Sequence, residues 1–410
     1  MARPTPAALF FPLLLPFGVV VGYAQVTTPN VLDKLGFLAI VATAAQQTGG
    51  LPHTLKLLWA PALDARGKRS TWFVASLIVA ALGLAGTVLV DAKASLSLYT
   101  GLLFIANVGA ATSSAAVDAL MATTVPIERK GAAAGWSMAG NLGGTGVGGA
   151  LGLWLTDNFS KGVTAAVLGV VLLLCGVPIL RVDEPARAPH PMVDAVVALA
   201  TDLWRTARSR EGWTGLIICI SPVGAGAAVN LFSGGMHNDY GVSEHRVEIV
   251  TGLLGGLVSA VGCMAGGWLA DRMSRRLAYA VSGGVTALIA LYMAFGPLTQ
   301  DVFTYGTLAY QFTNGISYSA FVALVLEMIG HEGAVTTKYT LFVAASNWAI
   351  SYTAIIDGWG YDKARVKGLF LADAAATFVG IAILAVMVLL TRKRPGGPAE
   401  PAAVMVDDLR

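Results

Sequence analysis

Twelve long apolar runs limit what this chain can fold into more than any other feature of its sequence. A helix needs about 20 mostly apolar residues to cross a bilayer. Runs of that kind lie at about 8–26, 35–60, 71–90, 96–122, 132–155, 162–181, 213–236, 247–270, 276–296, 302–329, 337–356 and 367–390. Only 12% of the 410 residues are charged, against about 25% in soluble domains. We therefore predict an all-α integral membrane protein with twelve transmembrane helices, whose first run is a retained helix rather than a signal peptide.

The positions of Lys and Arg predict how the chain is oriented. Cytoplasmic loops carry an excess of these residues. If the twelve runs alternate across the membrane, only seven of the 27 Lys and Arg residues fall on the side away from the termini. These seven are Lys34, Lys93, Lys161, Arg246, Lys363, Arg365 and Lys367. The sequence therefore predicts that both termini lie in the cytoplasm.

A weak internal repeat runs through the chain at nearly half its length. The Pro-x-Gly at 16–18 corresponds to that at 222–224, Asn141 corresponds to Asn347, and Asp64 corresponds to Asp271. We predict two six-helix pseudo-repeats, 1–181 and 213–390, with a linker at 182–212 and a disordered cytoplasmic tail at 391–410. The apolar spacing in 192–210 is typical of an amphipathic helix on the membrane surface, and a solvated linker helix is the alternative.

A loop motif occurs once in each half. Residues 267–276 read GWLADRMSRR, which resembles the G-x-L-A-D-R-x-G-R-R loop of the major facilitator superfamily with Ser274 in place of Gly. The first-half copy is at 64–69, with Ala60 where Gly is usual. An Asp here can lie against the positive N-terminus of a neighbouring helix, which would form a gating clasp, and ordinary positive-inside anchoring is the alternative. The gating residues are Asp64, Arg66, Lys68, Arg69, Asp271, Arg272, Arg275 and Arg276.

A narrower resemblance covers residues 35–157. The segment 56–64 reads KLLWAPALD and resembles the K-F-L-W-x-P-x-x-D signature of the AmpG-type muropeptide permeases, a branch that also includes acetyl-CoA transporters. The Asp-Ala at 118–119, the ERKG at 128–131 and the GALGLWLTD at 149–157 agree in order. Ser113 and Ser114 replace the Gln-Asp that family members often carry. The resemblance implies a secondary transporter, and some siderophore permeases share it.

Few ionisable groups lie inside the apolar runs, where each costs several kcal/mol unless it faces a cavity or a partner. Asp118 lies roughly 15 Å from the following loop, so we predict either proton coupling or a structural pair with Lys56. Lys56 and His53, one turn apart, are candidates for contacting an anion, although Lys56 could instead snorkel. Glu327 is a second proton-coupling candidate, placed near a gate or loop. Asp373 lies in a peripheral span, which favours a structural role.

Uncharged polar side chains gather in several of the runs. Those that we predict to line a substrate cavity are Tyr23, Gln25, Gln46, Asn107, Asn230, Tyr310, Gln311, Asn314, Tyr318, Asn347 and Trp348. The alternative for each is a hydrogen bond that holds two helices together. The many glycines of 132–155 favour close, sliding contact between spans of one chain over a dimer face.

The remaining features narrow the function. The chain has no phosphate-binding G-x-x-x-x-G-K-[ST] motif, and its five His and three Cys residues lack metal-site spacing. We therefore predict no enzyme activity, no cofactor, no metal and no nucleic-acid partner. We predict a monomer in a bacterial inner membrane that imports a polar, anionic, muropeptide-like solute with protons by alternating access. A siderophore or acyl-CoA-like cargo, drug or metabolite efflux, and a non-transporting membrane sensor or scaffold are the alternatives.

Overall fold

The computed structural model describes residues 5–65, 67–184, 197, 200–201, 204–205, 208–229, 236–329 and 335–391. Regular structure within these residues is helical. The α-helices are α1 (Phe10–Gly22), α2 (Thr28–Lys34), α3 (Ala39–Leu55), α4 (Ala60–Ala65), α5 (Arg69–Leu89), α6 (Leu96–Thr124), α7 (Lys130–Asn158), α8 (Lys161–Gly176), α10 (Arg210–Ile220), α12 (His237–Asp239), α13 (Glu244–Val247), α14 (Leu254–Arg272), α15 (Arg275–Phe295), α16 (Gln300–Ile329) and α17 (Val335–Thr391). Short 3-10 or π-helical turns are η1 (Ala7–Leu9), η2 (Tyr23–Thr27), η3 (Lys56–Leu58), η4 (Ile127–Arg129), η5 (Val177–Arg181) and η7 (Glu248–Leu253).

The helices agree with a protein that spans the membrane many times. Eight stretches of the described chain are long and apolar enough to cross a bilayer. One of them, in α17, holds two of the predicted spans, because the backbone leaves the helical region at Ala364 and Arg365. Three other predicted spans correspond to α3 with α4, to the glycine-rich α7 and to the short α10. Polar residues lower the apolar content of α3, and glycines lower that of α7. Helix α10, with 11 residues, is too short to cross a bilayer.

Two helices differ in extent from the sequence prediction. The first continues past residue 26 to Lys34 through the π-helical turn η2. The run at 213–236, expected to be one helix, is interrupted because α10 ends at Ile220. Pro222 follows, which has no backbone N–H to donate. Gly224 and Gly226 then adopt positive φ angles of 57° and 66°, a conformation open to Gly but strained for other residues.

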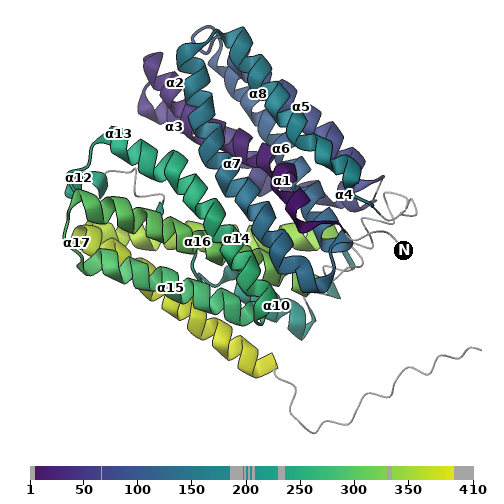
Figure 1. Ribbon diagram of the computed structural model, residues 1–410, viewed down its shortest axis with the longest axis vertical. Helices are drawn as coiled ribbons and strands as arrows, with labels where there is room; N and C mark the ends of the chain where they lie inside the picture. The colour runs from purple at the N-terminus through teal and green to yellow at the C-terminus, as the bar shows by residue number, and fades with distance from the viewer. Residues whose placement is uncertain are drawn as a thin grey trace, which may run out of the picture.

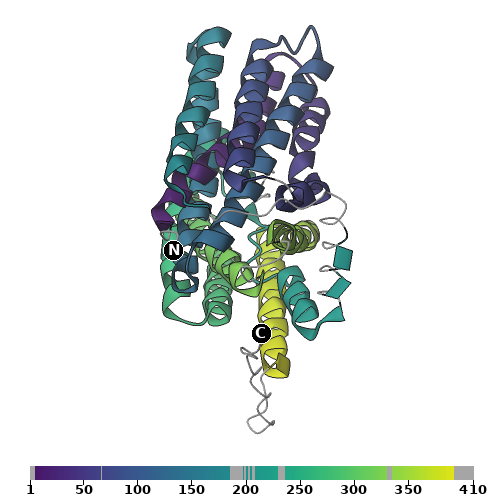
Figure 2. The same ribbon diagram turned by 90° about the vertical axis from the view of Figure 1, so that its right-hand side faces the viewer.

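The described helices form two groups (Figures 1 and 2). In Figure 1 the purple and blue ribbons of α1–α8 lie in the upper part, and the green and yellow ribbons of α12–α17 lie below them. Figure 2 shows the same division from the side. The boundaries predicted at 181, 212 and 390 stay predictions, since most of the linker and the tail after 391 lie outside the described residues.

Helix α7 joins the two groups, since it packs closely against α1 of its own group and against α14 of the other. A Cβ on Gly148 would lie 2.4 Å from the Cα of Val19 in α1. On its other side, a Cβ on Gly135 would lie 2.8 Å from the backbone oxygen of Cys263 in α14. The glycines of α7 therefore allow two helix contacts within the chain, as small residues do in membrane proteins.

The two groups meet at one end of the molecule, which we call the motif end because Asp64 and Asp271 lie there. In Figure 1 the ribbons converge toward the side marked N and diverge toward α2 and α13 at the opposite end. The cross-group hydrogen bonds at the motif end join α4 to α17, α14 to α7 and α7 to α16. This end is closed in the structure.

Candidate functional site

Asp271, at the end of α14, caps the N-terminus of α7. Its Oδ1 accepts from the backbone N–H of Gly131 at 2.7 Å, and its Oδ2 accepts from that of Ala132 at 2.7 Å. Both donors belong to the first turn of α7, where backbone N–H groups lack helical partners and carry the positive end of the helix dipole. This is the contact that the loop motif predicts.

Asp64, in α4, makes the matching contact with the start of α17. Its Oδ1 accepts from the N–H and hydroxyl of Thr336 at 3.2 and 2.5 Å. Its Oδ2 accepts from the N–H and hydroxyl of Thr337, both at 3.0 Å. Arg69 lies 3.5 Å from Oδ1 of Asp64 and is almost fully buried. We call the Asp271 contact the second clasp and the Asp64 contact the first clasp.

Further cross-group contacts strengthen the motif end. The fully buried Lys130 donates from Nζ to the backbone oxygen of Leu326 at 2.7 Å. Arg275 pairs with Glu327 within its own group and also donates to the backbone oxygen of Ile127 in the other group. Glu327 is thus held at the motif end by a guanidinium group, which is the gate position expected of it.

The remaining basic residues of the motif lie nearer the surface. Lys68 is exposed, and the guanidinium of the exposed Arg272 lies over the ring of Trp268 at 3.9 Å. Arg276 is half-buried. Arg66 lies outside the described residues.

A polar cluster lies within the N-terminal group, where α3, η3 and α6 meet. The Nε2 of His53 is 2.8 Å from Oδ1 of Asn107, and the ring of Phe17 packs edge-on against His53 at 5.0 Å. One turn further along, Lys56 interacts electrostatically with Asp118. Both of these charged residues are 7% exposed. The structure therefore brings together four residues that the sequence analysis singled out from two separate spans.

Asp118 also connects the two groups. Tyr339, in the second turn of α17, donates its hydroxyl hydrogen to the Asp118 carboxylate. Tyr339 is itself buried. The proton-coupling candidate is therefore placed at the contact between the groups, one turn beyond the first clasp on α17. Sequence reasoning missed Tyr339, although a tyrosine inside the run at 337–356 was a usable signal.

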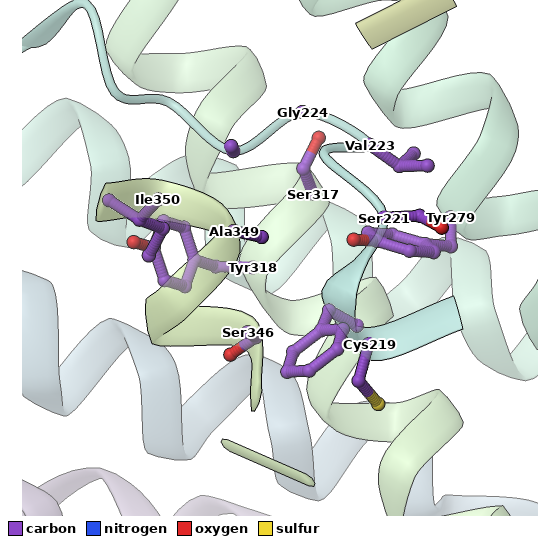
Figure 3. Close-up of a pocket in the computed structure, with 12 residues that line it drawn as sticks. Cys219, Ser221, Val223, Gly224, Tyr279, Ser317, Tyr318, Ser346, Ala349 and Ile350 are labelled. Carbon is purple, nitrogen blue, oxygen red and sulfur yellow. The ribbon is translucent and has the colours of Figure 1, made fainter. Parts of the chain in front are cut away.

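The C-terminal group offers a small polar pocket, shown in Figure 3. Its polar lining comes from the end of α10, from α15, α16 and α17: Cys219, Ser221, Tyr279, Ser317, Tyr318 and Ser346. The pocket has room of about 30 Å³, enough for a water molecule or two and too little for an organic solute. Ser346, in the lining of this pocket, lies two turns beyond Tyr339 on α17.

The predicted polar stripe of α16 is divided by the structure. Tyr318 lines the pocket of Figure 3. Gln311 and Asn314 are buried, and their amides donate to the backbone oxygens of Val250 and Gly224, each at 3.4 Å. Those two contacts hold neighbouring segments together, which was the alternative for these residues. The hydroxyl of Tyr310 donates instead to Asp373 of α17.

The other predicted cavity residues lie apart from this pocket. Tyr23 is buried and hydrogen-bonded to Tyr99 beside a separate cavity of about 190 Å³. Gln25 is exposed and Gln46 half-buried. Asn347 is exposed, and the 72% exposed Trp348 lies on the face of α17 opposite Ser346 and Ile350. Asn230 lies outside the described residues. Among described residues, no group of three His, Cys, Asp or Glu could hold a metal.

Comparisons with known proteins agree with this geometry. A family model described as Major Facilitator Superfamily matches residues 38–352. The chain is 26% identical over 388 residues to the anhydromuropeptide permease of Escherichia coli (strain K12), which covers 92% of this chain and 76% of that protein. The fold of this chain resembles that of the E. coli fucose:proton symporter, with a TM-score of 0.72 and 17% identity. The match covers 93% of this chain and 98% of the symporter. The fold also resembles that of a human organic anion transporter, with a TM-score of 0.68 and 16% identity. The match covers 92% of this chain and 98% of that transporter.

Proposed function

Because this chain belongs to the major facilitator superfamily, we propose that it is a secondary transporter that imports an anionic, muropeptide-like solute together with protons. The observation that carries the proposal is the buried Lys56–Asp118 pair, hydrogen-bonded through Asp118 to Tyr339 of the other group. An ammonium group there can bind a solute carboxylate, and a carboxylate beside it can carry a proton. The likeness to the anhydromuropeptide permease supports the choice of cargo.

The proposed cycle follows from the charges. In the closed-motif-end state, Asp118 is opposite Lys56, and the two charges attract each other. A proton arriving on Asp118 neutralises its carboxylate and leaves the Lys56 ammonium free to bind an anionic group. The neutral acid also binds Tyr339 less strongly, since a hydrogen bond to a charged acceptor is roughly twice as strong as a neutral one. Loading therefore weakens a contact between the groups and favours opening of the motif end.

Direction follows from topology in this proposal. If the motif end is cytoplasmic, as the Lys and Arg distribution predicts, then the structure is closed to the cytoplasm and diverges toward the outside. Proton and solute would enter from the outer side and leave when the two clasps open. This is alternating access between two packings of the same helices.

The test is uptake by right-side-out vesicles that contain the full chain. Labelled anhydromuropeptide is supplied with and without a protonophore, and an iron–siderophore and acetyl-CoA are supplied in parallel. We expect accumulation of the muropeptide that the protonophore abolishes. Asp118→Asn should lose accumulation while retaining exchange of labelled for unlabelled solute, because exchange needs no net proton movement. Lys56→Gln should lose both.

The matched control is Asp301→Asn, which neutralises an exposed carboxylate at the start of α16 and should transport normally. Accumulation of the siderophore or of acetyl-CoA instead of muropeptide would change the cargo and leave the coupling intact. Uptake by Asp118→Asn that still follows the proton gradient would overturn the role of Asp118. No uptake of any cargo would move the search to efflux in inverted vesicles.

A further inference from the structure

Two aspartates meet inside the C-terminal group, remote in sequence from Asp118. Asp357 and Asp373 both belong to α17, on opposite sides of the break at Ala364 and Arg365. Asp357 is fully buried, and Asp373 is 1% exposed. In a straight helix, their separation in sequence would place them about 24 Å apart. Their carboxylates nevertheless interact electrostatically, so the break folds α17 back on itself and brings them together.

Glycines allow the two arms of α17 to lie this close. A Cβ on Gly360 would lie 2.5 Å from the backbone oxygen of Gly368, and a Cβ on Gly368 would lie 2.0 Å from that of Gly360. Gly360 is one turn beyond Asp357 on the first arm. The backbone crossing therefore presses the two acidic side chains into one buried space.

The two carboxylates have fewer hydrogen-bond donors than their oxygens can accept. Oδ2 of Asp373 accepts from the hydroxyl of Tyr310 at 2.9 Å. Oδ1 of Asp373 and both carboxylate oxygens of Asp357 are buried and have no hydrogen-bond partner among the described residues. The buried hydroxyl of Thr353, one turn before Asp357 on the same face of the helix, also lacks a partner. Buried polar atoms are normally paired, so these oxygens indicate a bound species between them.

No described cation neutralises the pair. Arg365, at the break, is paired with Asp239 of α12. Lys363 and Lys367 lie over the rings of Trp359 and Phe295. Among the described residues, the titratable groups that interact with these two carboxylates are each other and Tyr310. Within the described residues, no ion pair joins Asp357 or Asp373 to a Lys, Arg or His.

Two carboxylates that interact inside a low-dielectric interior cannot both remain charged. We infer that Asp357 and Asp373 share one proton and form a second proton-binding site, separate from Asp118. The acid that holds the proton donates to a carboxylate oxygen of the other, and Tyr310 donates to Oδ2 of Asp373. The pair then carries one negative charge. Of the oxygens without a partner, one carries the proton and another accepts it in a hydrogen bond.

The first arm of α17 couples this site to the contacts between the two groups. Its other end carries Thr336, Thr337 and Tyr339, which bind Asp64 and Asp118 of the N-terminal group. A movement that breaks those contacts displaces Asp357 relative to Asp373 on the second arm. The pair should therefore change its proton affinity as the motif end opens. This coupling rests on the proposed alternating access, whereas the shared proton does not.

The experiment is infrared absorption of the purified full chain in lipid vesicles at neutral pH, where a protonated carboxylic acid shows its own C=O stretch. The signal is taken as the difference between wild type and variant. A shared proton predicts that the double variant Asp357→Asn/Asp373→Asn removes the signal of one acid, whereas either single variant leaves that signal in place. The remaining acid keeps the proton, because a lone carboxylate is costly to charge in a buried site. Asp301→Asn, at an exposed site, should change nothing.

Other outcomes overturn the inference. If each single variant removes half of what the double variant removes, the two acids are independent. No loss in the double variant would mean that both carboxylates are charged. Loss of the wild-type signal on adding sodium chloride, with choline chloride as control, would mean that a sodium ion occupies the site instead. If an Asn variant fails to fold, Tyr310→Phe should shift the frequency without removing the signal, and an unshifted band would place the acid elsewhere. Coupling requires that Asp271→Asn, which loosens the second clasp, alter the wild-type signal.

Discussion

The two clasps at the motif end use the same residue type in different ways. The described hydrogen bonds to Asp271 come from backbone N–H groups, at a point where α7 and α14 are in direct backbone contact. Arg275 and Arg129 interact with Asp271 electrostatically. A Cβ on Gly267 would lie 2.4 Å from the backbone oxygen of Gly131. Asp64 binds side-chain hydroxyls as well as backbone N–H groups, and it has Arg69 beside it. The second clasp therefore depends on close helix packing, and the first on side-chain hydrogen bonds.

This difference shows why one motif can tolerate departures in one copy and not in the other. The first copy has Ala60 where the motif usually has Gly, and it keeps its contact through Thr336 and Thr337. The second copy keeps the glycine, Gly267, that the backbone contact requires. Substitutions that add a methyl group, remove a charge or remove one hydroxyl should therefore act unequally on the two clasps.

The largest effect is expected from Gly131→Ala. The new Cβ would lie 2.4 Å from Oδ1 of Asp271 and 2.6 Å from the backbone oxygen of Gly267, so the helices must separate. Overpacking typically costs about 1–3 kcal/mol, which shifts the closed–open ratio of the motif end by about fivefold to more than a hundredfold. Distances between spin labels at positions 68 and 276, in a background without native cysteines, would measure this ratio.

The matched control for this change is Gly169→Ala in α8, where a Cβ would meet nothing within 4 Å. Ala is also the better helix former, so any opening caused by Gly131→Ala cannot come from helix propensity. An unchanged distance distribution in Gly131→Ala would contradict the steric account of the second clasp.

An effect of similar size is expected from removing charge, and it should differ between the clasps. Asp271→Asn places an amide N–H against backbone N–H groups that cannot accept, and loss of a charged hydrogen bond costs about 1.5–3 kcal/mol. Asp64→Asn faces the hydroxyls of Thr336 and Thr337, which can rotate to accept from the amide. The same spin-label pair should show more opening for Asp271→Asn, and the reverse order would refute the comparison. Asp64→Asn also removes the charge that faces Arg69 within the N-terminal group. Thermal unfolding measures the stability lost with that ion pair, separately from the opening of the clasp.

The smallest effect is expected from Thr337→Val, which removes one hydroxyl donor to Asp64 and leaves the backbone N–H in place. A loss of about 1 kcal/mol corresponds to roughly a fivefold shift in the closed–open ratio. Thr340→Val is the control, because the Thr340 hydroxyl donates only to its own helix at the oxygen of Thr336. Equal effects of the two valine variants would show that the hydroxyl does not contribute to the clasp.

Particular residues show how far sequence reasoning reached. The run lengths and the loop motif predicted a helical membrane transporter of the major facilitator superfamily, and this prediction is confirmed. A structural pair with Lys56 was one of the two alternatives for Asp118, and the two groups interact electrostatically. Asp357 was missed because the run was ended at 356, before the helix ended. Gln311 and Asn314 share one helical face with Tyr318, yet only Tyr318 lines the pocket.

By itself, the sequence determined that the chain is a helical membrane protein and which of its residues are polar within the apolar runs. It could do so because bilayer thickness sets the length of a span, and because each helix satisfies its own backbone hydrogen bonds. Only the tertiary structure decided the partner of each polar side chain: Tyr339 for Asp118, Tyr310 for Asp373 and the start of α7 for Asp271. Each of these contacts joins spans far apart in the sequence. The fit of whole helices against each other, with glycine where backbones touch, selects the pairs that meet.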